Sequence, residues 1–359
     1  MHKVYIWGTG YWGENCFQDI LDGVEVCGFV ESSVSQCSFQ GKQVISGQEL
    51  EEQEYDYVIL ANTHEDAILE RFHLEEHKTI RYRERPALAG VRLFKYQIND
   101  QVRGHMPYLS MECDGLYFLY NRTDLLIPNA MSFYKSTWSR AEMLFFWREA
   151  PRRDKGIFLD IGANIGTTAI YFRKKLAPDL NYIAFEPVRE NVKVLKMNCI
   201  ANDCEDIAVE TVGISNTDGN MGLIVVEANY GGSRVSGCGP GKGVCETVRL
   251  DAYVQKNQIC PQDIAYIWMD IEGHEADAIA GAKEVLMQSD ASLFMEYNAA
   301  EYRDNGKLER ILDDLHSIYQ YFLCYEQYAV GKKYKRAIRE LEELAEEMDW
   351  QQCNVLFLK

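Results

Sequence analysis

The stretch Gly156 to Glu186, GIFLDIGANIGTTAIYFRKKLAPDLNYIAFE, decides the fold. Its first apolar run, 157–161, is typical of a buried strand, and glycines follow before a helical pattern begins. A second apolar run ends at Glu186, which lies 20 positions after Gly166, and Pro187 then breaks the chain. The order of strand, glycine turn, helix, strand and acid predicts a Rossmann-type nucleotide-binding unit in an α/β fold.

The residue types in this turn indicate which nucleotide it binds. Glycines let the backbone approach a ligand closely, and a carboxylate that ends the second strand can accept hydrogen bonds from ribose hydroxyls. The turn also contains an acid, which is ill suited to a pyrophosphate and better suited to a cation. S-adenosylmethionine carries a sulfonium and an ammonium, so the turn favours a methyltransferase over a dinucleotide enzyme. The predicted cofactor-binding residues in this stretch are Asp160, Gly162, Asn164, Gly166 and Glu186.

Four blocks of the sequence resemble the FkbM-type methyltransferases, a class I S-adenosylmethionine-dependent family. They are LDIGANIG (159–166), FEPVRENVKVLKMNCIAN (185–202), RLDAYV (249–254) and YIWMDIEGHEADAIAGAKEVL (266–286), in the family's order. The resemblance implies the class I methyltransferase fold, a seven-stranded Rossmann-like sheet. It also implies methyl transfer to a hydroxyl of a sugar, glycoconjugate precursor or other secondary metabolite. By the same resemblance, Ser215 and Asn216 occupy a turn that contacts the adenine.

The fourth block supplies the candidate catalytic residues. An apolar strand, 264–269, ends at Asp270, and Glu272 and His274 follow before a helix over 276–286. Because the carboxyl ends of parallel strands face the ligand crevice, we expect Asp270 near the cofactor. Methyl transfer needs an aligned acceptor and a group that takes its proton, and Asp270 is the first candidate for this role. The helix dipole or packing are alternative reasons for Glu272 and His274. Because these residues are so close in sequence, no metal site is expected here.

A second glycine turn lies near the N-terminus. A strand-like run, 3–7, precedes a literal G-x-G-x-x-G at Gly8, Gly10 and Gly13, and Glu31 ends the next apolar run. This pattern matches a dinucleotide fingerprint and predicts a smaller Rossmann-like α/β domain in which a nucleotide or NAD(P) is the candidate ligand. The alternative is a turn that serves folding only. An NAD(P)-dependent sugar or sugar-nucleotide oxidoreductase or epimerase is therefore the alternative function, and a non-catalytic module is a third hypothesis.

Length, charge and cysteine content restrict the remaining possibilities. The 359 residues suit two domains, and the patterns predict a Rossmann-like domain over 1–98, a hairpin and connector helix over 99–150, and a methyltransferase domain over 151–359. The net charge of -18 argues against a nucleic-acid partner. The 11 cysteines form no C-x-x-C pair, and neither a secretory signal nor a membrane-spanning run is evident. We therefore expect a cytoplasmic protein with a small-molecule or carbohydrate acceptor; homodimer formation is left open.

Three local predictions concern the C-terminal half. The glycine-rich segment 229–243 is expected to form a loop inside a hairpin, in which Ser233, Arg234 and Ser236 are candidate acceptor contacts. Segments 319–328 and 354–358 are expected to close the sheet as an antiparallel pair. Between them, the charged residues 332–349 predict a helix whose acidic run, 340–347, is solvated.

Overall fold

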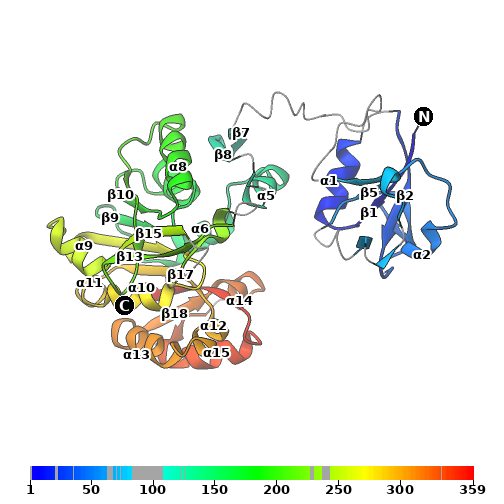
Figure 1. Ribbon diagram of the computed structural model, residues 1–359. Coiled ribbons are helices and arrows are strands. Elements are labelled where there is room, and N and C mark those ends of the chain that lie inside the picture. Colours follow the sequence, from blue (N-terminus) through cyan, green and yellow to red (C-terminus); the bar gives the residue numbers. More distant parts are fainter. Residues whose placement is uncertain are drawn as a thin grey trace. The chain divides into compact units, whose positions relative to one another are not determined.

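The computed structural model describes residues 2–20, 23–34, 36–62, 68–69, 71–72, 74–82, 108–121, 123–124, 126–226, 230–236, 243–332 and 334–359. The chain divides into two compact units, Met1–Pro107 and Tyr108–Lys359, which are described separately (Figure 1). Residues 83–107, which include the predicted boundary at 98, lie outside the described residues. From residue 108 on, the hairpin and connector helix predicted for 99–150 belong to the second unit.

The first unit is a Rossmann-like sheet with the strand order β3-β4-β2-β1-β5-β6. All neighbouring strands pair parallel except β3, which is antiparallel to β4. Residues of β1 alternate between two buried clusters, one on each face of the sheet. The elements are β1 (Lys3–Trp7), α1 (Tyr11–Asp19), β2 (Glu25–Glu31), β3 (Ser38–Phe39), β4 (Lys42–Ser46), α2 (Gly47–Leu50), β5 (Tyr57–Leu60), the 3-10 helix η1 (Glu76–Lys78) and β6 (Thr79–Arg81).

The second unit is organised by an eight-stranded sheet of order β11-β10-β9-β16-β17-β20-β18-β19. The strands from β11 to β17 pair parallel, and β20, β18 and β19 pair antiparallel. Seven strands match the prediction, including the closing antiparallel pair; β19 is an additional edge. The strands are β9 (Ile157–Ile161), β10 (Asn181–Phe185), β11 (Ala208–Glu210), β16 (Ile264–Met269), β17 (Ser292–Tyr297), β18 (Tyr321–Cys324), β19 (Arg336–Ala337) and β20 (Cys353–Leu358).

Helices cover both faces of this sheet, as its uninterrupted apolar strands require. Central strand β16 is buried throughout and sends Ile267 and Met269 into one cluster and Tyr266 and Trp268 into the other. The helices whose residues join the second cluster are α5 (Leu126–Tyr134), α6 (Arg140–Glu149), α7 (Thr167–Tyr171), its π-helical continuation η2 (Phe172–Leu176) and α8 (Arg189–Ala201). Those whose residues join the first are α9 (Leu250–Lys256), α10 (Glu275–Gly281), α11 (Lys283–Gln288), α12 (Ala299–Asp304), α13 (Leu308–Ile318) and α15 (Leu341–Glu347).

A smaller four-stranded sheet has the order β12-β15-β13-β14. Its strands are β12 (Gly213–Ile214), β13 (Gly219–Ile224), β14 (Arg234–Ser236) and β15 (Gly243–Val248), with the 3-10 helix η3 (Tyr230–Gly232) before β14. The segment predicted as a loop, 229–243, therefore contains a strand, β14, which pairs antiparallel with β13. Residues 227–229 and 237–242 and the side chain of Ser236 lie outside the described part of the chain.

The predicted hairpin is formed by β7 (Tyr108–Cys113) and β8 (Leu116–Asn121). Two buried asparagines, Asn198 of α8 and Asn202 at the C-cap of that helix, hold the second strand of the hairpin. The Asn198 side chain accepts from Leu119 N at 2.6 Å and donates to Leu119 O at 3.0 Å, and Asn202 makes the same pair of bonds to Tyr117. The two side-chain amides thus satisfy backbone N–H and C=O groups of β8 that would otherwise need a neighbouring strand. This role explains why two polar side chains are buried at this helix.

The helix predicted over 332–349 is divided into three pieces: β19, the 3-10 helix η5 (Ile338–Glu340) and α15. The prediction missed that the Arg336 side chain is buried and forms ion pairs with Glu340, Glu343 and Glu347. Part of the acidic run therefore neutralises a buried cation and is not merely solvated surface. A short helix, α14 (Tyr325–Ala329), follows β18, and η4 (Pro261–Asp263) precedes β16. In the described residues, no helix is both long and apolar enough to cross a bilayer.

Candidate active site

The order of the strands in the sheet of the second unit indicates where a ligand is expected to bind. The chain runs outward from β9 through β10 to β11, and then returns to the other side of β9 with β16 and β17. In open α/β sheets, ligands bind at such a reversal, beyond the carboxyl ends of the strands. The loops after β9 and β16 meet there, because Asp270 N donates to Ile161 O at 3.0 Å. The two most informative sequence blocks therefore meet at one crevice.

Gly162 makes this approach possible. Its φ is +88°, and a Cβ at this position would lie 1.9 Å from the backbone oxygen of Asp270. No side chain fits there, and an L-residue disfavours this backbone conformation as well. The glycine therefore allows the turn after β9 to pack directly on the end of β16.

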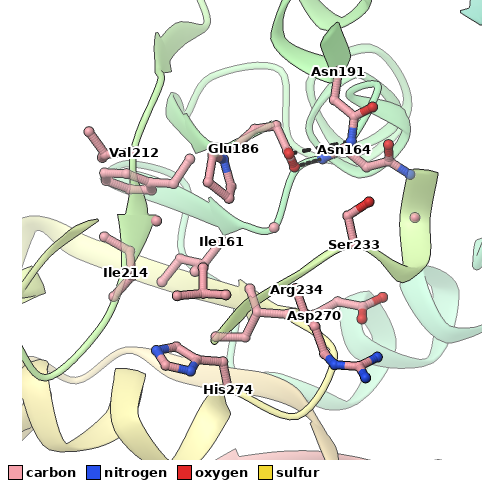
Figure 2. A pocket seen from close by; sticks show the side chains of 17 residues that line it. Ile161, Asn164, Glu186, Asn191, Val212, Ile214, Ser233, Arg234, Asp270 and His274 are labelled. Carbon is pink, nitrogen blue, oxygen red and sulfur yellow. Dashed lines mark hydrogen bonds between the residues drawn. The ribbon is translucent and has the colours of Figure 1, made fainter. Parts of the chain in front are cut away.

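Glu186 ends β10 and holds the glycine turn from the other side. One carboxylate oxygen accepts from Asn164 N at 2.9 Å, and the other accepts from Asn191 Nδ2 at 3.3 Å (Figure 2). The second oxygen also accepts from Val188 N at 2.8 Å. A carboxylate has about four lone-pair sites, so these three donors leave capacity for a ligand hydroxyl. The buried side-chain Oδ1 of Asn164 accepts no hydrogen bond from the residues that the structure describes and is a second available acceptor.

A first cavity, with an empty volume of about 470 Å³, opens beside these groups. Its walls are largely apolar side chains from the ends of several strands, and Glu186, Asn164 and Arg234 supply polar groups (Figure 2). Such a lining suits a flat heterocycle with a polar sugar attached. The apolar wall consists of Ile161, Phe185, Pro187, Val212, Ile214, Val235 and Ile271.

A second cavity, with an empty volume of about 940 Å³, shares Gly162, Asn164, Gly231 and Asp270 with the first. Four carboxyl groups line it, and no Lys or Arg occurs among its described lining residues. The carboxyl groups belong to Glu142, Asp270, Glu272 and Glu296, and the other side chains include Trp138, Trp268, Gln352, Asn354, Thr167 and Thr168.

The structure separates the three residues proposed as catalytic. Asp270 lines both cavities, Glu272 lines only the second, and His274 lines only the first. The Nε2 of His274 lies 2.9 Å from the buried Ser215 Oγ. Of the three, Asp270 alone is shared by the two cavities.

Four predicted cofactor residues do not line either cavity: Asp160, Gly166, Ser215 and Asn216. The buried Asp160 carboxylate accepts from Ala169 N at 3.0 Å and so fixes the start of α7. Gly166, with a φ of +88°, precedes that helix. Asn216 donates to Asp277 Oδ1 at 3.1 Å, and that carboxylate also pairs with Lys307 and Arg310. These residues thus shape the turns around the cavities.

Burial raises the pKa values of the carboxyl groups at this crevice. It raises the pKa of Glu186 to about 7, against the opposing effect of its three donors. Burial, with repulsion from Asp270, raises the pKa of Glu272 to about 7 and that of Glu296 to about 9. The pKa of Asp270 is also raised by burial. Carboxyl groups with such pKa values can exchange protons near neutral pH, or stabilise a cation.

Sequence reasoning missed several lining residues. Glu142 projects from α6, in the segment predicted as a connector helix. Gln352 and Asn354 come from the start of β20, far from any motif. Asn191 lies five positions after Glu186, and the two side chains meet only because the chain turns back after β10. None of these positions carries a sequence signal of its own.

In the first unit, the predicted turn forms as well. A Cβ on Gly13 would lie 1.9 Å from Gly8 O, so this glycine is required by packing within the turn. Glu31, at the end of β2, accepts a hydrogen bond from Thr9 Oγ1 of this turn. Both contacts are accounted for by the fold of the unit itself.

Comparison with known proteins is consistent with these features. Residues 160–330 match the family model described as the methyltransferase FkbM domain, and residues 1–79 match one described as C2185-like, N-terminal. No curated protein matches the chain significantly. Among solved structures, a methyltransferase FkbM from Methylobacillus flagellatus KT is similar at 16% identity, over 99% of this chain and 90% of that chain, with a TM-score of 0.38.

Two other solved structures are similar over the larger part of the chain. An O-methyltransferase from Bacillus cereus in complex with SAH has 12% identity, over 62% of this chain and 81% of that chain, with a TM-score of 0.36. The P. horikoshii protein TYW2 in complex with MeSAdo has 12% identity, over 78% of this chain and 75% of that chain, with a TM-score of 0.33.

The sheet order, the glycine turn and the paired cavities define the second unit as a class I Rossmann-like methyltransferase fold. Within that class, residues 160–330 are a domain of the FkbM family of S-adenosylmethionine-dependent methyltransferases. The comparisons give no support to a nicotinamide cofactor in the first unit.

Proposed function

We propose that the second unit transfers a methyl group from S-adenosylmethionine to a hydroxyl of a sugar, glycoconjugate precursor or other secondary metabolite. The observation that carries this proposal is the junction of the two cavities at Asp270. The first cavity has apolar walls and polar groups of the kinds that suit a nucleoside, and the second is lined by polar groups that can bind an acceptor. A methyl group that moves from a cofactor in the first cavity to an acceptor in the second would pass beside Asp270.

The residues of the first cavity fit an adenosyl group. Its apolar walls suit adenine, and Glu186 retains an acceptor site for a ribose hydroxyl. Asn164 lines both cavities, and its Oδ1, which has no partner among the described residues, is an acceptor for a ligand donor. When bound, S-adenosylmethionine supplies an electrophilic methyl on a sulfonium, and the carboxyl groups beyond Asn164 favour that cation over a neutral or anionic group.

Asp270 is the proposed group that takes the acceptor's proton. Its carboxylate makes no hydrogen bond with the side chains described here and lines both cavities, so it is free to accept from a substrate hydroxyl. Burial holds its pKa above the ordinary range, which brings it closer to the value that suits a general base. Glu272 lines the same second cavity, where its ionised form adds negative charge.

The second cavity supports a sugar-like acceptor. Its amide and hydroxyl side chains, Gln352, Asn354 and Thr167, provide donors and acceptors for several hydroxyl groups. The indoles of Trp138 and Trp268 provide apolar surface beside them. This mixture of polar and aromatic side chains suits a ring that carries many hydroxyls.

The test is a methyl-transfer assay with S-adenosylmethionine and a panel of sugars and sugar nucleotides, read by mass spectrometry and by NMR of the product. We expect an O-methyl ether as the product. Asp270→Asn should lower kcat by about 100-fold or more while S-adenosylhomocysteine affinity is retained. The matched control is Glu309→Gln, on an exposed position of α13, which should change neither quantity. Full activity in Asp270→Asn, or a product methylated on nitrogen, would contradict the proposal.

A further inference from the structure

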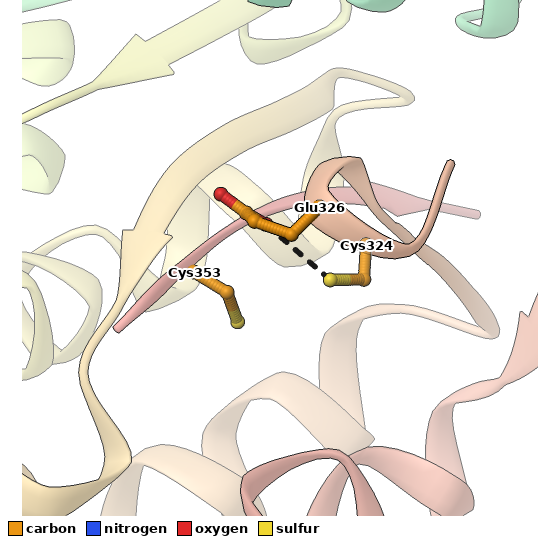
Figure 3. A group of neighbouring side chains, drawn as sticks. All are labelled: Cys324, Glu326 and Cys353. Carbon is orange, nitrogen blue, oxygen red and sulfur yellow. Dashed lines mark hydrogen bonds between the residues drawn. The ribbon is translucent and has the colours of Figure 1, made fainter. Parts of the chain in front are cut away.

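A second cluster of chemically reactive side chains lies outside the two cavities. Cys324 ends β18, Glu326 lies in the first turn of α14, and Cys353 begins β20 (Figure 3). The two thiols are buried, and Glu326 is half-buried. One potential ligand atom from each residue, two Sγ and one carboxylate oxygen, all lie within 4.8 Å of one another.

The backbone brings these residues together and fixes their side chains. In the antiparallel pair, Cys324 is opposite Val355, so Cys353 lies on the same face, two residues along β20. The Glu326 carboxylate accepts from Asn354 N at 3.1 and 3.0 Å and from Asn354 Nδ2 at 3.2 Å. It also accepts from Cys324 Sγ at 3.4 Å (Figure 3). The carboxylate is therefore oriented toward the thiols by the neighbouring strand.

This arrangement has the dimensions of a metal site. With Zn–S bonds of about 2.3 Å and Zn–O bonds of about 2.1 Å, ligand atoms on a tetrahedral zinc lie roughly 3.6–3.8 Å apart. The thiol-to-carboxylate distance of 3.4 Å and the upper limit of 4.8 Å within the group bracket that range. Hydrogen bonds that orient a ligating carboxylate, like those from Asn354, are a regular feature of metal sites.

The surroundings also favour a cation. Among the described residues, no Lys, Arg or His forms an ion pair with Glu326. Glu296 and Glu142 are further carboxyl groups close enough to interact electrostatically with this cluster. Two thiolates and a carboxylate on a divalent ion leave one net negative charge, the same net charge as one carboxylate beside two protonated thiols before binding. Sulfur ligands select zinc over magnesium or calcium.

We propose that Cys324, Glu326 and Cys353 bind a Zn²⁺ ion, with a water molecule as the fourth ligand. The ion ties β18, α14 and β20 together at the end of the sheet where Gln352 and Asn354 line the second cavity. It thereby stabilises the wall of the proposed acceptor site. The two thiols lose their protons on binding, and these protons pass to solvent.

The test uses the full chain, reduced and treated with chelator, and Co²⁺ as a spectroscopic probe. We expect one Co²⁺ per chain, a thiolate-to-metal charge-transfer band in the near ultraviolet, and its loss when Zn²⁺ displaces Co²⁺. Zn²⁺ should also raise the Tm. Cys353→Ser should lose about half of the charge-transfer intensity. Its affinity for Co²⁺ should fall by at least about tenfold, because loss of a residue that only orients a metal ligand already costs about that much.

Two further variants keep the test decisive. Glu326→Gln retains both thiols and should still weaken Co²⁺ binding by about tenfold or more, even if Cys353→Ser does not fold. Cys113→Ser removes a buried thiol from a different cluster and should bind like the wild type. No charge-transfer band in the wild type at millimolar Co²⁺ would overturn the proposal. So would unchanged affinity in Glu326→Gln, or a Cys113→Ser effect equal to that of Cys353→Ser.

Discussion

Replacing Gly162 by alanine tests whether the contact between the loop after β9 and the loop after β16 builds the cofactor site. Gly331 provides a matched control, because its φ of +89° nearly equals the +88° of Gly162, yet a Cβ there would meet no atom within 4 Å. Both substitutions cost about 1–2 kcal/mol for the left-handed backbone. Only the substitution at Gly162 adds a steric conflict.

The conflict can be sized from the structure. The new Cβ would lie 1.9 Å from Asp270 O, and real Cβ contacts are essentially never below 3.0 Å, so the loops must separate by about 1 Å. A displacement of that size in a binding site can cost 100-fold. We therefore expect Gly162→Ala to weaken S-adenosylhomocysteine binding by at least tenfold, about 1.4 kcal/mol.

Isothermal titration calorimetry measures the affinity, and urea unfolding measures the stability of each variant. Gly331→Ala should lose about 1–2 kcal/mol of stability and keep wild-type affinity. If Gly162→Ala and Gly331→Ala bind equally well, the contact at Asp270 does not build the cofactor site.

Two further predictions concern stability. Asn198→Ala removes three hydrogen bonds that hold β8 and the glycine turn. At about 1 kcal/mol per bond, urea unfolding should show that the free energy of unfolding falls by roughly 3 kcal/mol. Asn305→Ala, at an exposed position, should lose little stability, and equal losses in the two variants would refute this account. Burial raises the folded-state pKa of Glu296 to about 9, so the fold opposes its ionisation and stability falls as the pH rises from about 4.5 toward 9. Glu296→Gln should therefore raise the Tm at pH 8 and not at pH 4; thermal scans showing the same change at both pH values would contradict this.

The parts of the fold that depend on periodicity could be predicted from the sequence. Strands β9 and β16 are continuous apolar runs bounded by acids and glycines, and such runs are typical of central parallel strands. The rule that ligands bind at the carboxyl ends of such strands then placed Glu186 and Asp270 at one crevice.

The remaining parts depend on contacts that leave no periodic signal. The charged segment 332–349 has helical composition, but Arg336 is buried against three glutamates and lies in the edge strand β19. Ser215 and His274 were assigned different roles, although their side chains contact each other. Glu142 reaches the second cavity from α6, and only packing of α6 on the sheet decides which of its residues do so.

The most direct test of the central claim is calorimetric titration of S-adenosylhomocysteine into the wild type and Glu186→Gln, with NAD⁺ and NADP⁺ titrated separately. The account predicts one micromolar site, on the order of -8 kcal/mol, in the wild type. It also predicts that binding is weakened in Glu186→Gln, because the amide cannot accept from ribose as a carboxylate does. Absence of S-adenosylhomocysteine binding to folded wild type, together with binding of a nicotinamide dinucleotide, would contradict it.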